Sequence, residues 1–466
     1  MFEEGLDPAS FRDPSGQVYI RDGRIFRTVM PCASDDFKYV NSTGLIEELE
    51  REGLIVESKH VDPAILGDKI AGACYVIEHP RLPFISYPYE WSFPALKTAS
   101  LMFLDIQLRA LGKGVTLSDA SAYNIQFVGP KPVFIDRLSF RRYQEGEFWR
   151  GHKQFCEQFL NPLLLRSIFG IPHNQWYRGA QEGIASEDLV RLLPWRRKLT
   201  WKILTNVVLP VTFQKKATKE LVVEQAKSYK NSKLPLVTFR RILESLKEWI
   251  SGLKPADTGK SVWSDYAKTH SYSFEEVRHK NQFIFNFIEA CKPKLVCDLG
   301  SNTGDYAAVA LKAGAEYVIG FDYDQKALEI AFSRAQEETL RYLPLFLDAA
   351  NPTPDQGWAQ RERKGLSRRL AADAILALAF THHLAIGRNI PLSGLLKWLI
   401  SLAPHGIVEF VPKSDPMIKY MLNFREDIFQ DYTEERFLSY LEAVANIVKT
   451  EVVSSSGRRL IRYSRR

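Results

Sequence analysis

The segment from Lys294 to Tyr306 constrains the fold of this chain more than any other part of its sequence. An apolar strand pattern leads into a turn that holds Gly300 and Gly304, and a helical pattern follows. Glycine has no Cβ atom, so such a turn can be left-handed and a ligand can approach its backbone closely. The turn also ends at helical N–H groups that lack intrahelical partners. Because tight turns use glycine for conformational reasons too, this segment alone leaves ligand binding open.

The segments that follow alternate between strand and helix patterns. Strands are predicted at 294–299, 316–322, 343–347, 373–380 and 406–411, with helices at 304–313 and 325–338. Two more predicted strands, 446–453 and 459–463, are joined by a Ser-Ser-Ser-Gly turn as a terminal hairpin. This alternation predicts an α/β domain with a mostly parallel sheet covered by helices.

Two acidic residues end the second and third predicted strands, at the same sheet edge as the glycine turn. Asp322 stands about twenty residues after the turn, where a carboxylate can accept both hydroxyl protons of a ribose. Asp348 is suited to the amino group of an adenine ring, although it could instead cap a turn. Asp324 is predicted to cap the next helix.

These residues resemble the cofactor motifs of class I S-adenosylmethionine-dependent methyltransferases, whose first motif here reads Asp298-Leu-Gly-Ser-Asn-Thr-Gly304. The resemblance implies a Rossmann-like, seven-stranded domain at 261–466 and methyl transfer as its activity. It assigns S-adenosylmethionine binding to six residues: Asp298, Gly300, Asn302, Gly304, Asp322 and Asp348. An NAD-binding fold shares the strand, turn and acid, but its G-x-G-x-x-G fingerprint is not present here.

Residues after the fourth and fifth predicted strands are the candidates for chemistry on a methyl acceptor. His382 and His383 follow the fourth strand, and one of them could be a general base or could pack against the next helix. Glu409 lies in the fifth strand, with Lys413 and Asp415 just beyond it. Glu409 could bind a polar acceptor or pair with a cation such as Lys413.

The resemblance also draws attention to the segment before the first strand, where the family often folds over its cofactor. The residues concerned are Trp263, Tyr266, His270, Tyr272 and Lys280. Aromatic core packing is the alternative for Tyr266 and Tyr272.

Residues 1–211 are predicted to form a separate α+β domain that is β-rich first and helical later. Asp22-Gly23 predicts a hairpin turn within 18–29, and a helix is predicted from Gly44 to Ser58. Helical patterns also cover 93–111 and 146–205. A polar, lysine-rich stretch at 212–260, with an amphipathic segment at 237–253, is predicted as a helical linker.

Asp119, Asn124 and Asp136 have a spacing that resembles the catalytic loop of kinases and aminoglycoside phosphotransferases. The resemblance implies a kinase-like domain in which Asn124 and Asp136 hold magnesium against ATP phosphates. Leu117 stands where that loop usually has histidine, and no glycine-rich nucleotide loop precedes it. An inactive kinase-like adaptor for substrate recognition is therefore favoured over a working phosphotransferase.

The combined layout is similar to a bacterial group of methyltransferases that includes host-specific nodulation-type proteins. Three segments carry this similarity: Tyr87-Pro-Tyr-Glu-Trp91, Asp119–Asn124 and the His382-His383 pair. The similarity supports methyl transfer, while the acceptor, the methylated atom and the oligomeric state stay open.

Composition sets further bounds. At 466 residues with 45% hydrophobic content, the chain is expected to form more than one domain. Its polar start and the lack of an apolar run of about eighteen residues predict no signal peptide, no membrane span and a cytoplasmic location. Five scattered cysteines predict neither a disulfide framework nor a zinc site, and we expect them to be reduced and buried.

The net charge of +7 permits an anionic partner without demonstrating one. The densest basic stretches are 195–202 and 361–369, and both are interpreted as solvated faces. The tryptophans and cations of 195–202 would suit nucleic acid, but packing of an amphipathic helix is the favoured interpretation.

Overall fold

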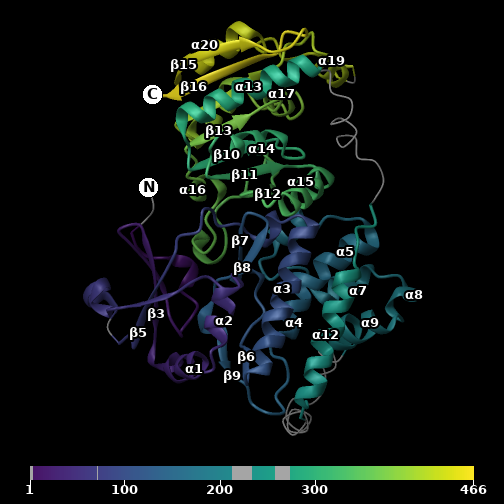
Figure 1. The fold of residues 1–466 in the computed structure, drawn as a ribbon. Coiled ribbons are helices and arrows are strands. Elements are labelled where there is room, and N and C mark those ends of the chain that lie inside the picture. The colour runs from purple at the N-terminus through teal and green to yellow at the C-terminus, as the bar shows by residue number, and fades with distance from the viewer. Residues whose placement is uncertain (1–3, 71, 213–232, 258–272, 424) are drawn as a thin grey trace. The chain divides into compact units, whose positions relative to one another are not determined.

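The computed structural model describes residues 4–70, 72–212, 233–257, 273–423 and 425–466 (Figure 1). The chain divides into an N-terminal unit (1–82, 86–126 and 132–258) and a C-terminal unit (83–85, 127–131 and 259–466). Two short segments from the first half of the sequence therefore belong to the C-terminal unit. The sequence predicts contiguous domains at 1–211, 212–260 and 261–466, without segments of the first half in the C-terminal unit. These boundaries remain a proposal.

The N-terminal unit begins with a five-stranded antiparallel sheet in the order β1-β2-β3-β5-β4. Its strands are β1 (Gly5–Leu6), β2 (Val18–Arg21), β3 (Arg24–Val29), β4 (Lys59–Val61) and β5 (Tyr75–His79). The predicted hairpin is confirmed, since β2 pairs with β3 and both Asp22 and Gly23 have positive φ, 52° and 71°. Such φ values are those of a two-residue hairpin turn.

The single helix predicted from Gly44 to Ser58 is wrong in its bounds. The structure has two helices in this region, α1 (Pro31–Ser42) and α2 (Leu45–Arg51). Gly44, with φ of 70°, separates them in a left-handed conformation. A signal for α1 was present in the sequence, because Pro31 suits the first helical turn and Ala33, Phe37 and Val40 recur on its buried face.

The rest of the N-terminal unit is mainly helical, as predicted. Helix α3 (Phe93–Gly112) matches the helix expected at 93–111. Two small strand pairs follow: β6 (Val115–Leu117) pairs antiparallel with β9 (Phe140–Arg142), and β7 (Ile125–Val128) pairs with β8 (Lys131–Phe134), a hairpin whose residues 127–131 belong to the C-terminal unit. The later helices are α4 (His152–Phe155), the π-helix η6 (Cys156–Leu160), α5 (Asn161–Phe169), α6 (Asn174–Gly179), α7 (Ser186–Leu192), α8 (Trp195–Lys198), α9 (Trp201–Ile203), the π-helix η7 (Leu204–Val208) and α12 (Leu236–Gly252).

Helix α12 lies in the predicted linker and confirms the amphipathic segment expected at 237–253. It packs along α3, where Lys247 Nζ lies 2.6 Å from an oxygen of Asp105. Short 3-10 turns complete the unit: η1 (Pro8–Ser10), η2 (Pro63–Ile70), η3 (Pro88–Glu90), η4 (Ala122–Asn124) and η5 (Arg137–Ser139). This described part of the linker is thus a packed helix.

The C-terminal unit is built on a seven-stranded sheet in the order β12-β11-β10-β13-β14-β16-β15. The strands are β10 (Leu295–Leu299), β11 (Tyr317–Asp322), β12 (Tyr342–Phe346), β13 (Ala374–Ala377), β14 (His405–Phe410), β15 (Ala445–Val452) and β16 (Arg459–Arg465). The first five are parallel, and β16 pairs antiparallel with both β14 and β15. The predicted parallel sheet with a terminal antiparallel hairpin is confirmed.

One helix precedes β10, and helices lie between successive strands from β10 to β15. Figure 1 shows these helices beside the sheet. They are α13 (Phe274–Cys291), α14 (Asp305–Lys312), α15 (Gln325–Glu337), α16 (Leu366–Arg369), α17 (Thr381–Ala385), α18 (Leu392–Leu402), α19 (Pro416–Leu422) and α20 (Glu434–Glu442), with a 3-10 turn η9 at Trp358–Gln360. The strand predicted at 373–380 was too long. Ala379 has φ of 49°, which ends the strand before α17 begins.

The cysteine prediction was half right. The five cysteines are free thiols, as expected, but of these only Cys156 and Cys297 are buried; Cys291 is half-buried, and Cys32 and Cys74 are exposed. Cys32 lies in the first turn of α1 and Cys74 directly precedes β5, where the local sequence pattern does not determine which side chains face solvent. No helix in the described ranges is both long and apolar enough to cross a membrane.

Candidate functional site

The turn after β10 has the left-handed backbone that its glycines predicted. Gly300, Asn302 and Gly304 have φ of 75°, 45° and 82°. The N–H groups of Gly300 and Ser301 donate to the carbonyl oxygen of Phe321 at 2.8 and 3.1 Å. These bonds attach the turn to the neighbouring strand β11, so its shape is determined by the sheet itself.

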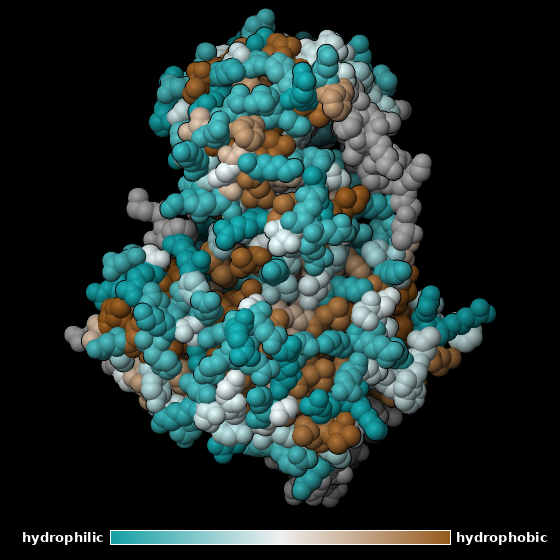
Figure 2. Space-filling view, viewed as in Figure 1, coloured by the Kyte–Doolittle hydropathy of each residue, from teal (hydrophilic) through white to brown (hydrophobic). Residues whose placement is uncertain are grey.

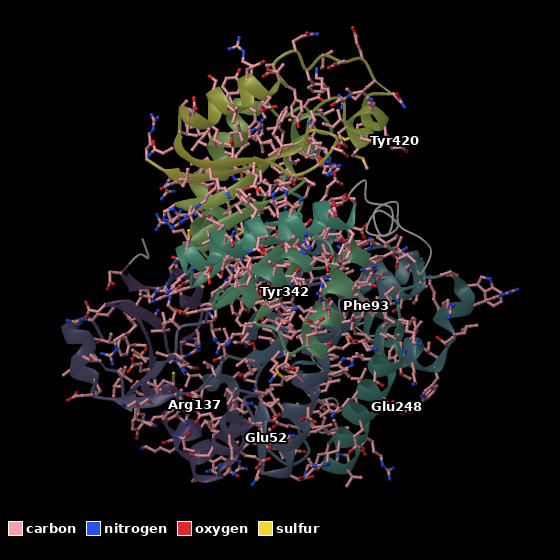
Figure 3. The ribbon with its side chains drawn as sticks, turned by 45° about the horizontal axis from the view of Figure 1, so that its top comes forward. Glu52, Phe93, Arg137, Glu248, Tyr342 and Tyr420 are labelled. Carbon is pink, nitrogen blue, oxygen red and sulfur yellow. The ribbon has the colours of Figure 1, made fainter. Side chains whose placement is uncertain are left out.

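Aromatic packing gives a structural reason for the two glycines. A Cβ atom on Gly304 would lie 2.6 Å from the ring of Tyr342, and one on Gly300 would lie 3.1 Å from the ring of Phe380. Tyr342 is fully buried inside the unit (Figure 3) and donates to Ser301 Oγ at 3.1 Å. Close approach of a ligand is therefore not needed to explain either glycine.

Asp322 ties the same turn to the end of β11. Its two carboxylate oxygens accept from the backbone N–H groups of Asn302 and Asp324, each at 2.8 Å. Burial raises the pKa of Asp322 to about 6. Asp324 accepts from the N–H groups of Lys326 and Ala327 and confirms the predicted cap of α15.

Asp298 lies one strand away and is 1% exposed. Its Oδ2 atom is buried and has no hydrogen-bond partner among the described residues. Burial, followed by the charge of Asp322, raises the pKa of Asp298 to about 7. A buried carboxylate without its full set of donors is costly in free energy, so this position favours a ligand that brings a donor or a positive charge.

Asp348 follows β12 at the same edge of the sheet. Its Oδ1 accepts from the N–H of Ala350 at 3.1 Å and lies 3.9 Å from Arg388. This contact is the turn cap that the sequence left as the alternative. A role in adenine binding remains a proposal.

The two histidines are neighbours in the first turn of α17, directly after β13. His382 is fully buried, and neither of its ring nitrogens has a partner among the described residues. The two rings lie 4.1 Å apart between centroids. Burial, and then the charge of Arg458, lowers the pKa of His383 to about 4, and burial lowers the pKa of His382 well below its ordinary value. Both rings are therefore neutral near pH 7.

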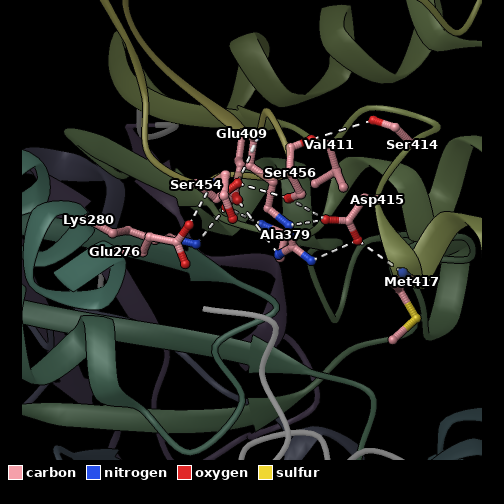
Figure 4. A network of polar contacts seen from close by, with 12 residues as sticks. Glu276, Lys280, Ala379, Glu409, Val411, Ser414, Asp415, Met417, Ser454 and Ser456 are labelled. Atoms are coloured by element: carbon pink, nitrogen blue, oxygen red, sulfur yellow. Dashed lines mark hydrogen bonds and ion pairs between the residues drawn. The ribbon is translucent and has the colours of Figure 1, made fainter. Parts of the chain in front are cut away.

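Glu409 is fully buried in a network of polar contacts (Figure 4). It accepts from Lys280 Nζ at 2.6 Å and from the backbone N–H of Ala379 at 2.8 Å. The suggested pairing with Lys413 is wrong, because Lys413 pairs with Asp427 at 2.8 Å instead. Pairing with a cation was right in kind, but the cation comes from helix α13.

A second buried ion pair lies beside Glu409 and was not predicted. Arg458, 1% exposed, binds Asp415 with its Nε and Nη2 atoms at 2.7 and 3.0 Å. Asp415 also caps α19 and accepts from Ser456 at 2.9 Å. No local sequence pattern indicates this pair, since its members are separated by 43 positions.

Some residues named in the sequence analysis lie outside the described residues. These are Trp263, Tyr266, His270 and Tyr272. Lys280, from the same group, is the buried partner of Glu409, and its Nζ also lies 4.8 Å from the ring centre of Tyr306.

In the N-terminal unit, the structure brings Asp119, Asn124 and Asp136 together. Asn124 Nδ2 lies 3.2 Å from Asp119 and 3.3 Å from Asp136. Arg27 lies 2.9 Å from Asp136 and compensates part of its charge. Over the ranges that the structure describes, no group of three or more His, Cys, Asp or Glu side chains could hold a metal ion.

No protein-family model matches the chain. A full-length relative does: the nodulation protein NoeA of Rhizobium meliloti (strain 1021) is 46% identical over 462 residues, which are 99% of this chain and 96% of the relative. The chain belongs to the NoeA family of nodulation proteins. The predicted similarity to nodulation-type proteins is thereby confirmed.

Solved structures match the chain over less than half its length. Magnesium protoporphyrin IX methyltransferase (ChlM) from Synechocystis PCC 6803 with bound SAH is 20% identical, with a TM-score of 0.31 over 44% of this chain and 93% of that chain. The N-methyltransferase NodS from Bradyrhizobium japonicum WM9 is 9% identical, with a TM-score of 0.31 over 41% of this chain and 98% of that chain. Matches at these identities and TM-scores carry no functional argument for this chain.

Proposed function

We propose that the C-terminal unit binds S-adenosylmethionine and transfers its methyl group to an acceptor. The observation that carries this proposal is the pair of buried acids, Asp298 and Asp322, at the ends of adjacent parallel strands. Both have raised pKa values, and Asp298 Oδ2 lacks a partner in the described ranges. A ligand with ribose hydroxyls and a positively charged centre would add donors at Asp322, supply the one that Asp298 Oδ2 lacks, and compensate the negative charge of both carboxylates.

Different residues at this edge of the sheet would bind different parts of the proposed ligand. Asp322 would accept from the ribose hydroxyls, and Asp348 would accept from the adenine amino group. The backbone at Gly300, Asn302 and Gly304 would face the methionine part, with Asp298 nearby. When bound, S-adenosylmethionine would supply a sulfonium methyl group, whose carbon–sulfur bond would break as the acceptor forms its bond to carbon and S-adenosylhomocysteine leaves.

Among the proposed catalytic residues, His383 fits the role of a base best. It is only partly buried, and its ring is neutral at pH 7, so it can accept a proton from an acceptor. His382 and Glu409 are 0% exposed, which limits direct contact with an acceptor in this conformation. Glu409 instead holds the backbone of Ala379, just before the histidines.

A competition between two adenosine-containing ligands, S-adenosylmethionine and NAD, tests the proposal against its nearest rival. In equilibrium dialysis with the full-length protein, we expect labelled S-adenosylmethionine to be retained and NAD to be unable to displace it. Retention of NAD without S-adenosylmethionine would contradict the proposal and favour a dinucleotide site.

A second candidate function belongs to the N-terminal unit, where Asn124 lies within hydrogen-bonding distance of both Asp119 and Asp136. This juxtaposition supports a magnesium- and ATP-dependent phosphotransferase of a kinase-like domain. However, the side-chain amide nitrogen of Asn124 faces both acids, and a magnesium ion between them would need the amide oxygen of Asn124 as its ligand instead. If this function holds, Asp136→Ala abolishes magnesium-dependent ATP binding. If ATP does not bind the unmodified protein at all, a non-catalytic adaptor that recognises the substrate is the better account.

A further inference from the structure

The region around helices α8 and α9 has an unusual charge pattern. From Leu189 to Thr212 the sequence holds no aspartate or glutamate but five cations: Arg191, Arg196, Arg197, Lys198 and Lys202. Among the described residues, Arg191 pairs with Asp188, and no carboxylate pairs with the other four. The segment therefore presents several uncompensated positive charges close together.

Large apolar side chains are exposed among these cations. Trp195 is 67% exposed, Leu199 is 66% exposed and Trp201 is 76% exposed. Figure 1 places α8 and α9 at the margin of the N-terminal unit, and Figure 2 shows hydrophobic and hydrophilic side chains next to one another there. Trp195 and Trp201 are thus not packed in the core, which corrects the expectation of a packed amphipathic helix.

The same segment is firmly attached to the rest of its unit. Leu193, Ile203 and Val207 are 3%, 5% and 0% exposed. These buried residues flank the exposed ones on both sides, with Leu193 before Trp195 and with Ile203 and Val207 after Trp201, so the exposed stretch is anchored at both ends. Exposure of tryptophan and leucine on an anchored segment is a mark of an interaction surface.

We propose that the segment from Leu192 to Lys202 docks on the surface of an anionic lipid bilayer. Tryptophan is suited to the boundary between headgroups and acyl chains, because its ring is apolar and its N–H is polar. Leu192 and Leu199 would enter the apolar layer, while the arginines and lysines bind lipid phosphates. The proposal is independent of methyl transfer, since it concerns only the surface of the N-terminal unit.

A nucleic acid would account for the charge and the tryptophans but not for the leucines. Binding to single strands uses a basic groove and aromatic rings on which bases stack. Leu192 and Leu199, which are 46% and 66% exposed, have no π-face and gain nothing from stacking. Burial of their apolar surface in a bilayer is favourable instead.

Sedimentation of the full-length protein with two kinds of vesicle tests the proposal. We expect binding to phosphatidylcholine vesicles that contain phosphatidylglycerol, much weaker binding to pure phosphatidylcholine, and loss of binding as salt rises. The double variant Arg196→Glu/Arg197→Glu should bind at least about tenfold more weakly, because each cation near an anionic surface contributes. Trp195→Ala/Trp201→Ala should also bind at least about tenfold more weakly.

Matched variants control for charge and for exposed tryptophan. Arg361→Glu/Lys397→Glu makes the same change in net charge at two exposed positions of the C-terminal unit, and Trp358→Ala removes another tryptophan that is 67% exposed. Both should bind vesicles within about twofold of the unmodified protein. Circular dichroism and the melting temperature verify that every variant is folded.

Three results would overturn the proposal: no binding to anionic vesicles, binding that the tryptophan and arginine variants leave unchanged, or equal loss in the control variants. Fluorescence anisotropy with a labelled single-stranded RNA completes the test. RNA binding that depends on Trp195 and Trp201, with no vesicle binding, would make the segment a nucleic-acid surface.

Discussion

At the scale of single residues, Asp298 links stability to pH. Its pKa is about 7 in the folded protein and about 4 in an unfolded chain. Because the folded pKa is the higher one, the folded protein binds the proton more tightly, and stability decreases as pH rises from about 4 to about 7. Above that range the full cost of the buried charge is present.

Asp298→Asn should therefore stabilise the ligand-free protein at pH 8 by up to about 4 kcal/mol, since a difference of about three pKa units corresponds to that free energy, and have little effect at pH 4. Melting temperatures measured at both pH values test this, and the same variant should bind S-adenosylmethionine more weakly. A loss of stability at pH 8 would mean that the carboxylate already has stabilising partners, contrary to the structure.

His383 gives a second prediction at this scale. Since burial and Arg458 lower its pKa to about 4, the ring should stay neutral from pH 8 down to about pH 5 and take up a proton only below that. Titration of the ring resonance by NMR, assigned with His383→Gln, measures this directly. A midpoint near the ordinary value of about 6.5 would show a solvated ring and contradict the lowering of its pKa by burial and by Arg458.

At the scale of elements, the Lys280–Glu409 pair joins helix α13 to strand β14. Lys280→Met removes the closer of two buried cations beside Glu409 and leaves only Arg458, 3.9 Å from the other carboxylate oxygen; removal of one partner of a buried pair costs about 3–5 kcal/mol. Lys280→Met/Glu409→Gln should lose less, because glutamine is uncharged and still accepts from the N–H of Ala379. Arg278→Met, at an exposed position of the same helix, should change stability by less than about 0.5 kcal/mol.

Urea unfolding of these three variants measures the free energies. A double variant as unstable as Lys280→Met, or less stable, would contradict the view that an uncompensated charge causes the loss.

The elements also show how far the sequence could predict the structure. The order of strands and helices in the C-terminal unit follows from local sequence patterns. The left-handed turn also follows, because glycines such as Gly300 and Gly304 are typical of positions with positive φ. The ion pairs do not follow from local patterns. Lys280 and Glu409 are 129 positions apart, and only the sheet order brings them together. Local patterns also do not determine which side chains are exposed. For this reason the sequence favoured packing for Trp195 and Trp201, whereas both are exposed.

At the scale of the whole molecule, the C-terminal unit depends on two segments from the first half of the chain. Phe84 contacts Phe321 and Phe127 contacts Phe332, each with ring centres 6.1 Å apart. The N–H of Gly129 donates to the hydroxyl of Tyr317 at 2.7 Å. A fragment of residues 259–466 lacks all of these contacts.

Such a fragment should be less stable than the unit in the full chain by about 3 kcal/mol or more, because two buried phenylalanines are lost. Differential scanning calorimetry of the fragment and the full-length protein tests this. A fragment that melts at the temperature of the C-terminal unit in the full chain would contradict the importance of these segments.

The central claim, that the acid after β11 holds S-adenosylmethionine, is tested most directly by calorimetric titration of three full-length proteins with that ligand. We predict binding to the unmodified protein, no measurable binding to Asp322→Ala, and affinity within about threefold of the unmodified value for Asp324→Ala. Asp324 serves as the control because its side chain caps α15, while its backbone N–H, which donates to Asp322, is retained in the alanine variant; loss of a cap costs about 1 kcal/mol of stability. An Asp322→Ala variant that binds as tightly as the unmodified protein, or an unmodified protein that does not bind, would contradict the account.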